Sequence, residues 1–247
     1  YCQKSSHMVY SSKMETHLPN KKKIVSKVFN DVFHKYDFMN DIMSLGIHRL
    51  WKKTFINWLN PQENTKLIDV ASGTGDIAKL FLNQTNNECE ICCVDENKGM
   101  LEINKKKFKN SNNIKWYCNN AEELPFEDNE FDYYTISFGI RNVVNINKAF
   151  KEAFRILKPG GRLLCLEFSK VQNEILNKFY KMYSKTIPKI GKIVVGNSEP
   201  YEYLINSIDE FYSQEELLNL LRKQNFKNAS YKNLTGGIVA IHSAWKI

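Results

Sequence analysis

One short segment, residues 67–76 with the sequence LIDVASGTGD, restricts the fold of this chain more than any other. Its apolar first half is typical of a buried strand, and two glycines, Gly73 and Gly75, follow closely. Glycine permits a sharp turn and lets the backbone approach a ligand. The apolar spacing after Asp76 is that of a helix, whose first N–H groups have no partner within the helix. The segment therefore predicts a strand, a glycine turn and a helix.

A second apolar run, residues 91–94, ends in Asp95, twenty residues after Gly75. A carboxylate at the tip of the second strand of such a unit can hydrogen-bond the hydroxyl groups of a ribose. We therefore expect the glycine turn and Asp95 to bind an adenosine-type cofactor.

The glycine spacing does not identify the cofactor, because Gly73-x-Gly75-x-x-Ala78 also fits the dinucleotide fingerprint. Asp69 and Asp76 flank the turn and would repel a pyrophosphate. S-adenosylmethionine has no phosphate and carries two positive groups, a sulfonium and an ammonium, so acidic neighbours suit it. The charge favours S-adenosylmethionine over a nicotinamide dinucleotide. In a third interpretation the turn binds nothing and Asp76 only caps the helix.

The composition is that of an ordinary globular protein, with 43% hydrophobic and 25% charged residues in a chain of 247. No apolar run approaches the roughly 20 residues that a membrane-spanning helix needs. The net charge of +8 has two interpretations. It favours binding to an anionic membrane or a nucleic acid, or the lysines only keep helix surfaces solvated. The six cysteines lack the spacing of a zinc site, so we expect reduced core residues, an intracellular compartment and no metal.

Strand and helix patterns alternate along the chain. An amphipathic helix is expected over 25–36, an apolar connection over 37–51, and a long insertion over 170–212. Lys158-Pro159-Gly160-Gly161 is expected to end a helix, Ser213 and Glu216 to form a capping box, and Gly236-Gly237 to form a hairpin turn. The predicted strands are 66–71, 90–95, 114–118, 133–138, 162–168, 228–234 and 237–245, and the helices among them are 76–84, 97–109, 146–157 and 213–224.

This alternation predicts an α/β fold with a doubly wound, mostly parallel sheet of seven strands, the last of them antiparallel. Ligands of such sheets bind beyond the carboxyl ends of the strands, where Asp69, Asp95, Asn119, Asn120 and Ser137 fall. We expect one domain over 21–247. Residues 1–20 are polar and are expected to be disordered or the remnant of a targeting segment.

Several motifs resemble those of class I S-adenosylmethionine-dependent methyltransferases, which have a Rossmann-like fold. Three longer strings are similar, more narrowly, to the ubiquinone/menaquinone C-methyltransferases, and the resemblance covers residues 24 to 247. The general motifs are DVASGTGD (69–76), VDEN (94–97), NAEELPF (120–126), SFGIRN (137–142) and LKPGGRL (157–163). The narrower strings are KYDFMNDIMSLGIHRLWK (35–52), IPKIGK (187–192) and NLTGGIVAIH (233–242).

The resemblance assigns cofactor contacts residue by residue. Thr74 matches a position in the glycine turn, Asp95 the carboxylate on the ribose, and Ser137 a further contact; Asn120 and Ala121 match the residues beside the adenine. Ser72 replaces a glycine found in many relatives, so its φ must be negative. The expected cofactor site is Asp69, Ser72, Gly73, Thr74, Gly75, Asp95, Glu96, Asn120, Ala121 and Ser137.

The resemblance also implies the reaction, which is methylation of a ring carbon in a polyprenylated benzoquinol or naphthoquinol. Methyl transfer is an in-line displacement, so alignment supplies much of the rate. The ring carbon is nucleophilic only when a ring hydroxyl is ionised or strongly hydrogen-bonded. The resemblance places Arg141, Asn142 and Tyr36 around a water near the acceptor. Since arginine stays protonated, we expect Arg141 to hold the phenolate and to polarise that water.

Each of these residues also has a structural interpretation. Tyr36 lies on the apolar stripe of the first helix and fits a core position. Arg141 fits a surface ion pair, and Asn142 fits the cap of the next helix. His48 fits packing better than acid/base chemistry.

A helical lid (21–60), with its apolar segment 37–51, and the insertion 170–212 are expected to wall a tunnel for the prenyl chain, or else to form a plain cap. The insoluble tail predicts peripheral association with a membrane, contacted by the basic N-terminal helix. The resemblance further implies a homodimer and a quinone-biosynthesis complex. It implies a location on the matrix side of the mitochondrial inner membrane or, alternatively, on the cytoplasmic face of a bacterial inner membrane.

Three rival functions differ in their motifs. A nucleic-acid methyltransferase is disfavoured because SFGI stands where amino-methylating enzymes carry [D/N]-P-P-[Y/F], and no proline precedes a cysteine. We therefore expect no nucleic-acid partner. Asp69 and Asp76 disfavour a dehydrogenase. A non-catalytic member of a quinone-synthesis complex stays open.

Overall fold

The computed structural model describes residues 21, 25, 41, 44, 46–195 and 198–247, and the following statements concern this part of the chain. Its centre is a seven-stranded sheet with the strand order β3-β2-β1-β4-β5-β7-β6. The strands are β1 (Thr65–Val70), β2 (Cys89–Val94), β3 (Ile114–Tyr117), β4 (Phe131–Ser137), β5 (Leu157–Phe168), β6 (Lys227–Leu234) and β7 (Val239–Trp245).

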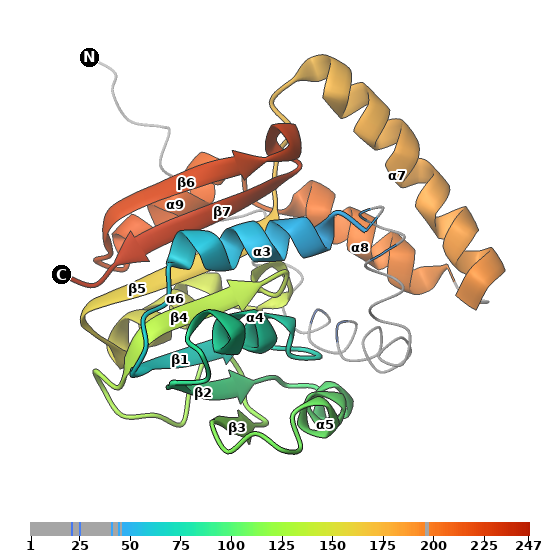
Figure 1. Ribbon diagram of the computed structural model, residues 1–247. Helices are drawn as coiled ribbons and strands as arrows, with labels where there is room; N and C mark the ends of the chain where they lie inside the picture. Colours follow the sequence, from blue (N-terminus) through green and yellow to red (C-terminus); the bar gives the residue numbers. More distant parts are fainter. Residues whose placement is uncertain (1–20, 22–24, 26–40, 42–43, 45, 196–197) are drawn as a thin grey trace, which may run out of the picture.

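Helices cover both faces of this sheet (Figure 1). One apolar cluster joins the sheet to α3, α4 and α8, and a second joins it to α6 and α9. The helices are α3 (His48–Leu59), α4 (Asp76–Gln84), α5 (Lys98–Lys107), α6 (Ile146–Ile156), α7 (Glu174–Val195), α8 (Glu199–Glu210) and α9 (Gln214–Lys223), with 3-10 turns η3 (Ile140–Asn142) and η4 (Thr235–Gly237).

The central strands are apolar on both faces because both are covered. Leu67 and Ile68 are adjacent in β1 and both are fully buried, but they belong to opposite clusters. Successive side chains of a strand point to opposite faces of the sheet. The near-continuous apolar runs in the sequence are therefore explained by burial on both sides, as parallel sheets require.

The α/β architecture predicted from the sequence is confirmed. The parallel pairs β1–β2, β1–β4, β2–β3 and β4–β5 form the doubly wound part, and β7 runs antiparallel to both β5 and β6. The helix at 76–84 has its predicted bounds. Ser213 and Glu216 form the predicted capping box, and η4 joins the predicted hairpin.

The helix end predicted ahead of Pro159 is confirmed to within one residue, whereas the predicted start of the next strand at residue 162 is wrong. Lys158-Pro159-Gly160-Gly161 does not separate helix from strand: α6 ends at Ile156 and β5 begins at Leu157, running through these residues. The pairing of β5 with β4 shifts in register between Phe131 and Tyr133, so the extra residues form a bulge. Gly160 supports it with a φ of +81° and donates its N–H to Lys246 O at 2.7 Å.

The cysteine prediction is confirmed for four residues and wrong for one. Cys89, Cys92, Cys93 and Cys165 are buried free thiols, whereas Cys118 is exposed. Cys118 lies one residue beyond the end of the edge strand β3.

The insertion 170–212 folds mainly as α7 and α8. Tyr201, Leu204 and Ile208 of α8 and Ile187 of α7 join the first apolar cluster. Residues 1–20, residues 26–36 of the predicted helix, with Tyr36 among them, and residues 37–40, 42, 43 and 45 of the apolar segment lie outside the described residues. None of the described helices has the length and apolar character required to cross a bilayer.

Candidate active site

A cavity of about 660 Å³ opens at the carboxyl edge of the sheet. Its size is typical of a small-molecule site, for which roughly 300–1,000 Å³ is usual. Six of the predicted site residues line it: Gly73, Asp95, Glu96, Asn120, Ala121 and Asn142. Asp69, Ser72, Thr74, Gly75, Ser137 and Arg141 belong to the same turns and strand ends without lining the cavity.

The glycine turn between β1 and α4 depends on left-handed backbone. Gly73 and Gly75 have φ values of +51° and +82°. A Cβ at Gly75 would lie 2.7 Å from Asn104 Oδ1 and 2.7 Å from a ring carbon of Phe108. Ser72 has negative φ, as its side chain requires. Ala71 is also left-handed, with φ +53°, which is strain of the kind that clusters at functional sites.

Asp95 connects this turn to the end of β2. Its Oδ2 accepts a hydrogen bond from Gly73 N at 2.9 Å, and its Oδ1 accepts one from Asn97 N at 2.8 Å. Burial raises the pKa of Asp95 to about 6, although these two donors favour the ionised form. The carboxylate is thus fixed at the cavity wall in the position predicted for a ribose contact.

The structure corrects the interpretation of the two acids that flank the turn. Asp76 does not cap α4: Gly75 is the N-cap residue, and Asp76 instead accepts from Lys52 Nζ at 2.9 Å and Lys107 Nζ at 2.8 Å. Burial opposes ionisation, yet these two ammonium groups hold the pKa of Asp76 well below its ordinary value. Its charge is therefore offset locally, which weakens the charge argument for the cofactor.

Asp69 is fully enclosed at the end of β1. Its Oδ1 accepts from Thr135 Oγ1 at 2.9 Å. Burial raises the pKa of Asp69 to about 7, so near neutral pH this side chain carries only part of a negative charge. Asp69 supports the strand end rather than presenting a full charge to a ligand.

Two features of the cavity region fit a polar, close-lying cofactor. Among the described residues, Ser137 Oγ at the end of β4 is buried and has no hydrogen-bond partner. Buried polar atoms normally have one, so a bound ligand or a water is expected to supply it. Gly139 follows, and a Cβ there would lie 2.4 Å from the Cβ of Ala71. The space between the ends of β1 and β4 therefore has no room for a side chain at position 139.

Arg141 is buried and paired, which contradicts the surface ion pair considered for it. The side chain is 6% exposed, and its Nη1 donates to Glu167 Oε1 at 2.7 Å and to Phe138 O at 2.8 Å. Glu167, at the end of β5, is 1% exposed, and burial raises its pKa despite the guanidinium. Arg141 Nε is buried without a partner among the described residues. The catalytic role of Arg141 stays a prediction.

Sequence reasoning missed Glu167, although a signal exists. It is the one charged residue in the apolar run LLCLEF of β5. A carboxylate inside a buried strand needs a cation or several donors, and here it has Arg141 Nη1 and Phe168 N.

Asn142 lines the cavity and has a second neighbour that the sequence did not indicate. Its Oδ1 accepts a hydrogen bond from Tyr203 Oη of α8 at 3.1 Å. The helix cap considered for Asn142 is wrong, because Asn145 caps α6 by accepting from Lys148 N at 3.0 Å. The insertion thus reaches the predicted acceptor position through α8. Tyr36, the third predicted catalytic residue, lies outside the described residues.

His48 is buried at the start of α3, away from the cavity lining. Its Nδ1 lies 2.9 Å from Ser44 Oγ. Burial lowers the pKa of His48, so the ring is neutral near pH 7. These contacts support the packing interpretation. Two described residues of the N-terminal segment do reach the cavity: Val25 lines it, and Lys21 Nζ donates to Val143 O at 2.8 Å.

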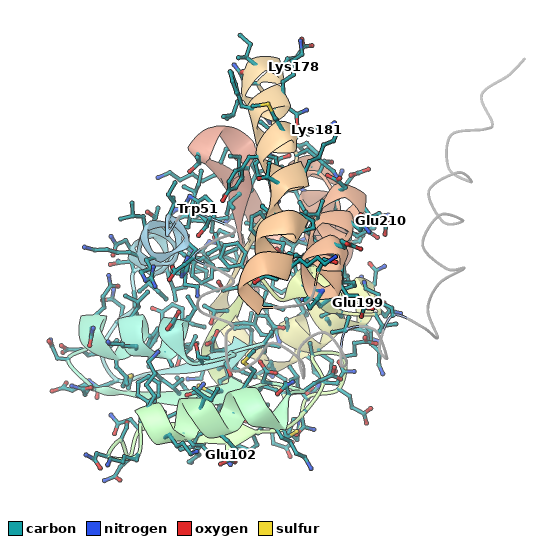
Figure 2. All side chains as sticks on the ribbon, turned by 90° about the vertical axis from the view of Figure 1, so that its right-hand side faces the viewer. Trp51, Glu102, Lys178, Lys181, Glu199 and Glu210 are labelled. Atoms are coloured by element: carbon teal, nitrogen blue, oxygen red, sulfur yellow. The ribbon has the colours of Figure 1, made fainter. Side chains whose placement is uncertain are left out.

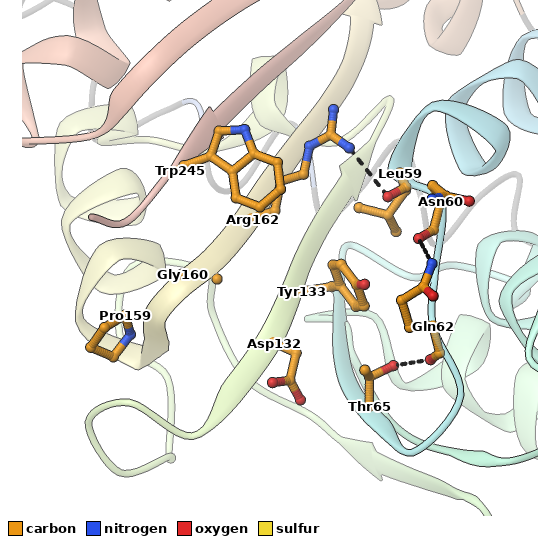
Figure 3. Close-up of a pocket in the computed structure, with 11 residues that line it drawn as sticks. Leu59, Asn60, Gln62, Thr65, Asp132, Tyr133, Pro159, Gly160, Arg162 and Trp245 are labelled. Carbon is orange, nitrogen blue, oxygen red and sulfur yellow. Dashed lines mark hydrogen bonds between the residues drawn. The ribbon is translucent and has the colours of Figure 1, made fainter.

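A second cavity, of about 360 Å³, lies at the opposite edge of the sheet, near the starts of β4 and β5 (Figure 3). Arg162 and Trp245 line it, with 4.9 Å between the guanidinium carbon and the indole ring. None of the predicted site residues that the structure describes lines it. It is also at the amino ends of the parallel strands, where sheets of this type do not bind their ligands.

The chain matches known proteins over almost its whole length. The family model described as the ubiE/COQ5 methyltransferase family matches residues 16–246. A Rickettsia bellii protein named ubiquinone/menaquinone biosynthesis C-methyltransferase is 52% identical over 234 residues, which cover 92% of this chain and 94% of that protein. A Rickettsia prowazekii protein of the same name is 52% identical over 231 residues, covering 91% and 93%.

Solved structures support the fold at low sequence identity. A S-adenosylmethionine-dependent methyltransferase from Thermotoga maritima has a TM-score of 0.64 at 20% identity, covering 90% of this chain and 99% of that one. A Haemonchus contortus phosphoethanolamine N-methyltransferase in complex with S-adenosylmethionine has a TM-score of 0.60 at 16% identity, covering 79% and 52%.

Proposed function

Because the chain belongs to the ubiE/COQ5 methyltransferase family, we propose that it transfers the methyl group of S-adenosylmethionine to a ring carbon of a polyprenylated benzoquinol. One observation carries the proposal: residues assigned to the cofactor from three separate strand ends, among them Gly73, Asp95 and Asn120, line a single cavity. The names of the Rickettsia relatives support a quinol acceptor and leave a naphthoquinol, hence a demethylmenaquinol methyltransferase, as the alternative.

The residues present fit the cofactor. When bound, S-adenosylmethionine supplies an electrophilic methyl group on a positively charged sulfur. Asp95 would accept hydrogen bonds from the ribose hydroxyls, and Asn120 and Ala121 would lie beside the adenine. Because Gly73 N already holds Asp95, the turn and the ribose contact would form one rigid unit.

The acceptor side would be formed by Asn142 and Arg141. Asn142 lines the same cavity, and Arg141 precedes it on η3. A positively charged guanidinium stabilises a phenolate, which makes the ring carbon nucleophilic. Glu167 and the Phe138 carbonyl oxygen would fix the orientation of that guanidinium. The released ring proton would pass to a water polarised by Arg141.

We extend the proposal to the surroundings of the enzyme. A polyprenyl acceptor is insoluble in water, so peripheral association with a membrane is expected, together with a homodimer and a quinone-biosynthesis complex. The matrix side of the mitochondrial inner membrane fits this setting. The cytoplasmic face of a bacterial inner membrane is the alternative, and the Rickettsia relatives are bacterial. A single domain over 21–247 stays a prediction.

The proposal is tested by product analysis. The protein is incubated with methyl-labelled S-adenosylmethionine and with demethylated benzoquinol or naphthoquinol carrying short prenyl tails, and mass spectrometry locates the label. Label on a ring carbon of the benzoquinol supports the proposal, and label on oxygen contradicts it. Asp95→Ala is the negative control. If cells carrying Asp95→Ala or Arg141→Ala still make quinone, the non-catalytic alternative is favoured instead.

A further inference from the structure

Helix α7 carries an exposed apolar stripe. Ile175, Phe179 and Met182 are 67%, 62% and 63% exposed, and they are three of the five large apolar side chains that are exposed in the described part of the chain. Residues spaced by three and four lie on one face of a helix. The opposite face is the one that packs on the protein, since Ile187 is buried and Tyr180 and Tyr183 are half-buried.

Lysines follow the same helix beside the apolar stripe. Lys178, Lys181 and Lys185 are exposed and again spaced by three and four, so they form a second, parallel stripe. The single acidic residue of α7 is Glu174, at its first position. We call the six residues Ile175, Phe179, Met182, Lys178, Lys181 and Lys185 the α7 face.

The α7 face is placed for contact with a large partner. Figure 1 shows α7 standing out from the sheet and its covering helices. Figure 2 shows Lys178 and Lys181 toward the upper end of α7, whereas Glu199 and Glu210 of α8 lie lower in this view. The two labelled lysines of α7 thus lie apart from the two labelled acidic residues of α8.

We propose that the α7 face docks on the surface of an anionic lipid bilayer. A helix lies in a membrane interface when apolar side chains enter the acyl boundary and flanking lysines contact anionic headgroups. A second copy of the chain fits this surface less well, because three apolar side chains on two helical turns fall short of the roughly 800 Å² per partner of a stable interface. The inference deepens the proposed function and rests on it for the lipid-soluble acceptor.

The location of α7 connects such docking to the cavity. α7 packs against α8, and Tyr203 of α8 donates to Asn142 on the cavity wall. Among the described elements, α8 therefore connects the proposed bilayer contact to the predicted acceptor position. The contact assigned here differs from the basic N-terminal helix that the sequence suggested.

The test is vesicle flotation of the full chain. One vesicle type has one part phosphatidylglycerol to two parts phosphatidylcholine, and the other has phosphatidylcholine alone. We expect binding to the anionic vesicles. Lys178→Glu/Lys181→Glu/Lys185→Glu should weaken it by at least about a hundredfold, since each lysine near such a surface contributes roughly fivefold. Phe179→Ser/Met182→Ser should weaken it by at least about tenfold.

A matched control separates a local contact from the overall charge. Lys79, Lys106 and Lys109 are exposed lysines on or next to α4 and α5. Lys79→Glu/Lys106→Glu/Lys109→Glu makes the same charge change, and we expect it to retain binding within about threefold. Equal loss in both triple variants, or no loss in the α7 variants, overturns the inference.

Two further measurements distinguish a failure of the docking inference from a failure of the proposed function and from self-association through α7. Methylation of a water-soluble, short-tailed quinol without vesicles tests the proposed function alone, and both α7 variants should retain it. Sedimentation measures the oligomeric state. If Phe179→Ser/Met182→Ser converts a dimer to monomers and leaves vesicle binding unchanged, the α7 face is an interface between copies and the bilayer assignment is wrong.

Discussion

At the scale of single residues, the carboxylates at the sheet edge differ because their partners differ. Asp76 is held between two lysines, Asp69 is enclosed with one hydroxyl donor, and Asp95 accepts from two backbone N–H groups at the cavity. The pKa of Asp76 is lowered, whereas burial raises those of Asp69 and Asp95. One residue type thus supplies a structural ion pair, a core group that is partly protonated near pH 7, and a carboxylate at the cavity wall.

Enclosure of Asp69 predicts a pH-dependent stability. Its pKa is about 7 in the folded protein and about 4 in the unfolded chain. The folded state therefore binds the proton more tightly, so the contribution of Asp69 to stability is complete below about pH 4 and is lost as the pH rises through about 7. Relative to Asp69→Asn, the wild type should lose roughly 2–4 kcal/mol of unfolding free energy between pH 4 and pH 8.

Urea denaturation of both proteins at pH 4 and pH 8 measures this difference. The wild type should lose stability relative to the variant at the higher pH. A wild type that gains stability relative to Asp69→Asn as the pH rises would show that the carboxylate is stabilised by the fold rather than destabilised.

If the buried pair of Glu167 and Arg141 is broken, we expect the rate of methyl transfer to fall while the affinity for S-adenosylmethionine is retained. Glu167→Gln leaves the guanidinium without its anion, so Arg141 loses its fixed orientation. A small displacement of a positioned group can reduce the rate by roughly a hundredfold. We expect kcat to fall tenfold to a hundredfold, while the Kd of S-adenosylmethionine stays within about twofold.

The control is Asp128→Asn, which breaks the exposed pair of Asp128 with Arg155. Exposed pairs contribute little, so kcat and Kd should both be unchanged. Calorimetry gives the Kd and product formation gives kcat. If Glu167→Gln raises the Kd as strongly as it lowers kcat, then the pair supports the whole site instead of orienting Arg141.

At the scale of elements, the junction of β1 and α4 depends on the absence of a side chain. Gly75→Ala would place an alanine in left-handed backbone. Its Cβ would lie 2.7 Å from Asn104 Oδ1 in α5 and 2.7 Å from a ring carbon of Phe108, the residue that ends α5. Backbone strain and overpacking together should cost about 2–4 kcal/mol of unfolding free energy. The affinity for S-adenosylmethionine should also fall, because the turn carries the contact to Asp95.

Gly160→Ala separates the two causes. Gly160 has nearly the same φ, +81° against +82°, but nothing lies within 4 Å of an added Cβ. It should cost only the backbone term, roughly 1–2 kcal/mol, and leave ligand affinity unchanged. Chemical denaturation of both variants checks this, and equal losses would mean that packing against Asn104 and Phe108 contributes nothing.

At the scale of the whole molecule, ligand binding should stabilise the fold because the site joins several strands. S-adenosylmethionine at about 100 times its Kd adds roughly 2.7 kcal/mol, which for a chain of this size raises Tm by about 5–10 °C. NAD should give no shift. Thermal unfolding with each ligand measures this, and a shift with NAD alone would reverse the assignment of the cofactor.

The sequence by itself determined the features that depend on local signals. The strand–turn–helix at 67–84, the capping box at Ser213 and the position of Asp95 follow from apolar periodicity, glycine placement and helix-cap chemistry. Each of these signals acts between residues a few positions apart. They were sufficient to predict the doubly wound sheet and the edge at which its cavity opens.

Only the tertiary structure decided which distant side chains meet. Lys52 reaches Asp76, Arg141 reaches Glu167, and Tyr203 reaches Asn142, over 24, 26 and 61 positions of sequence. These contacts arise when helices pack on the sheet and the chain returns to the same edge. A periodic pattern states which face of an element is buried, but it carries no information about which partner covers it.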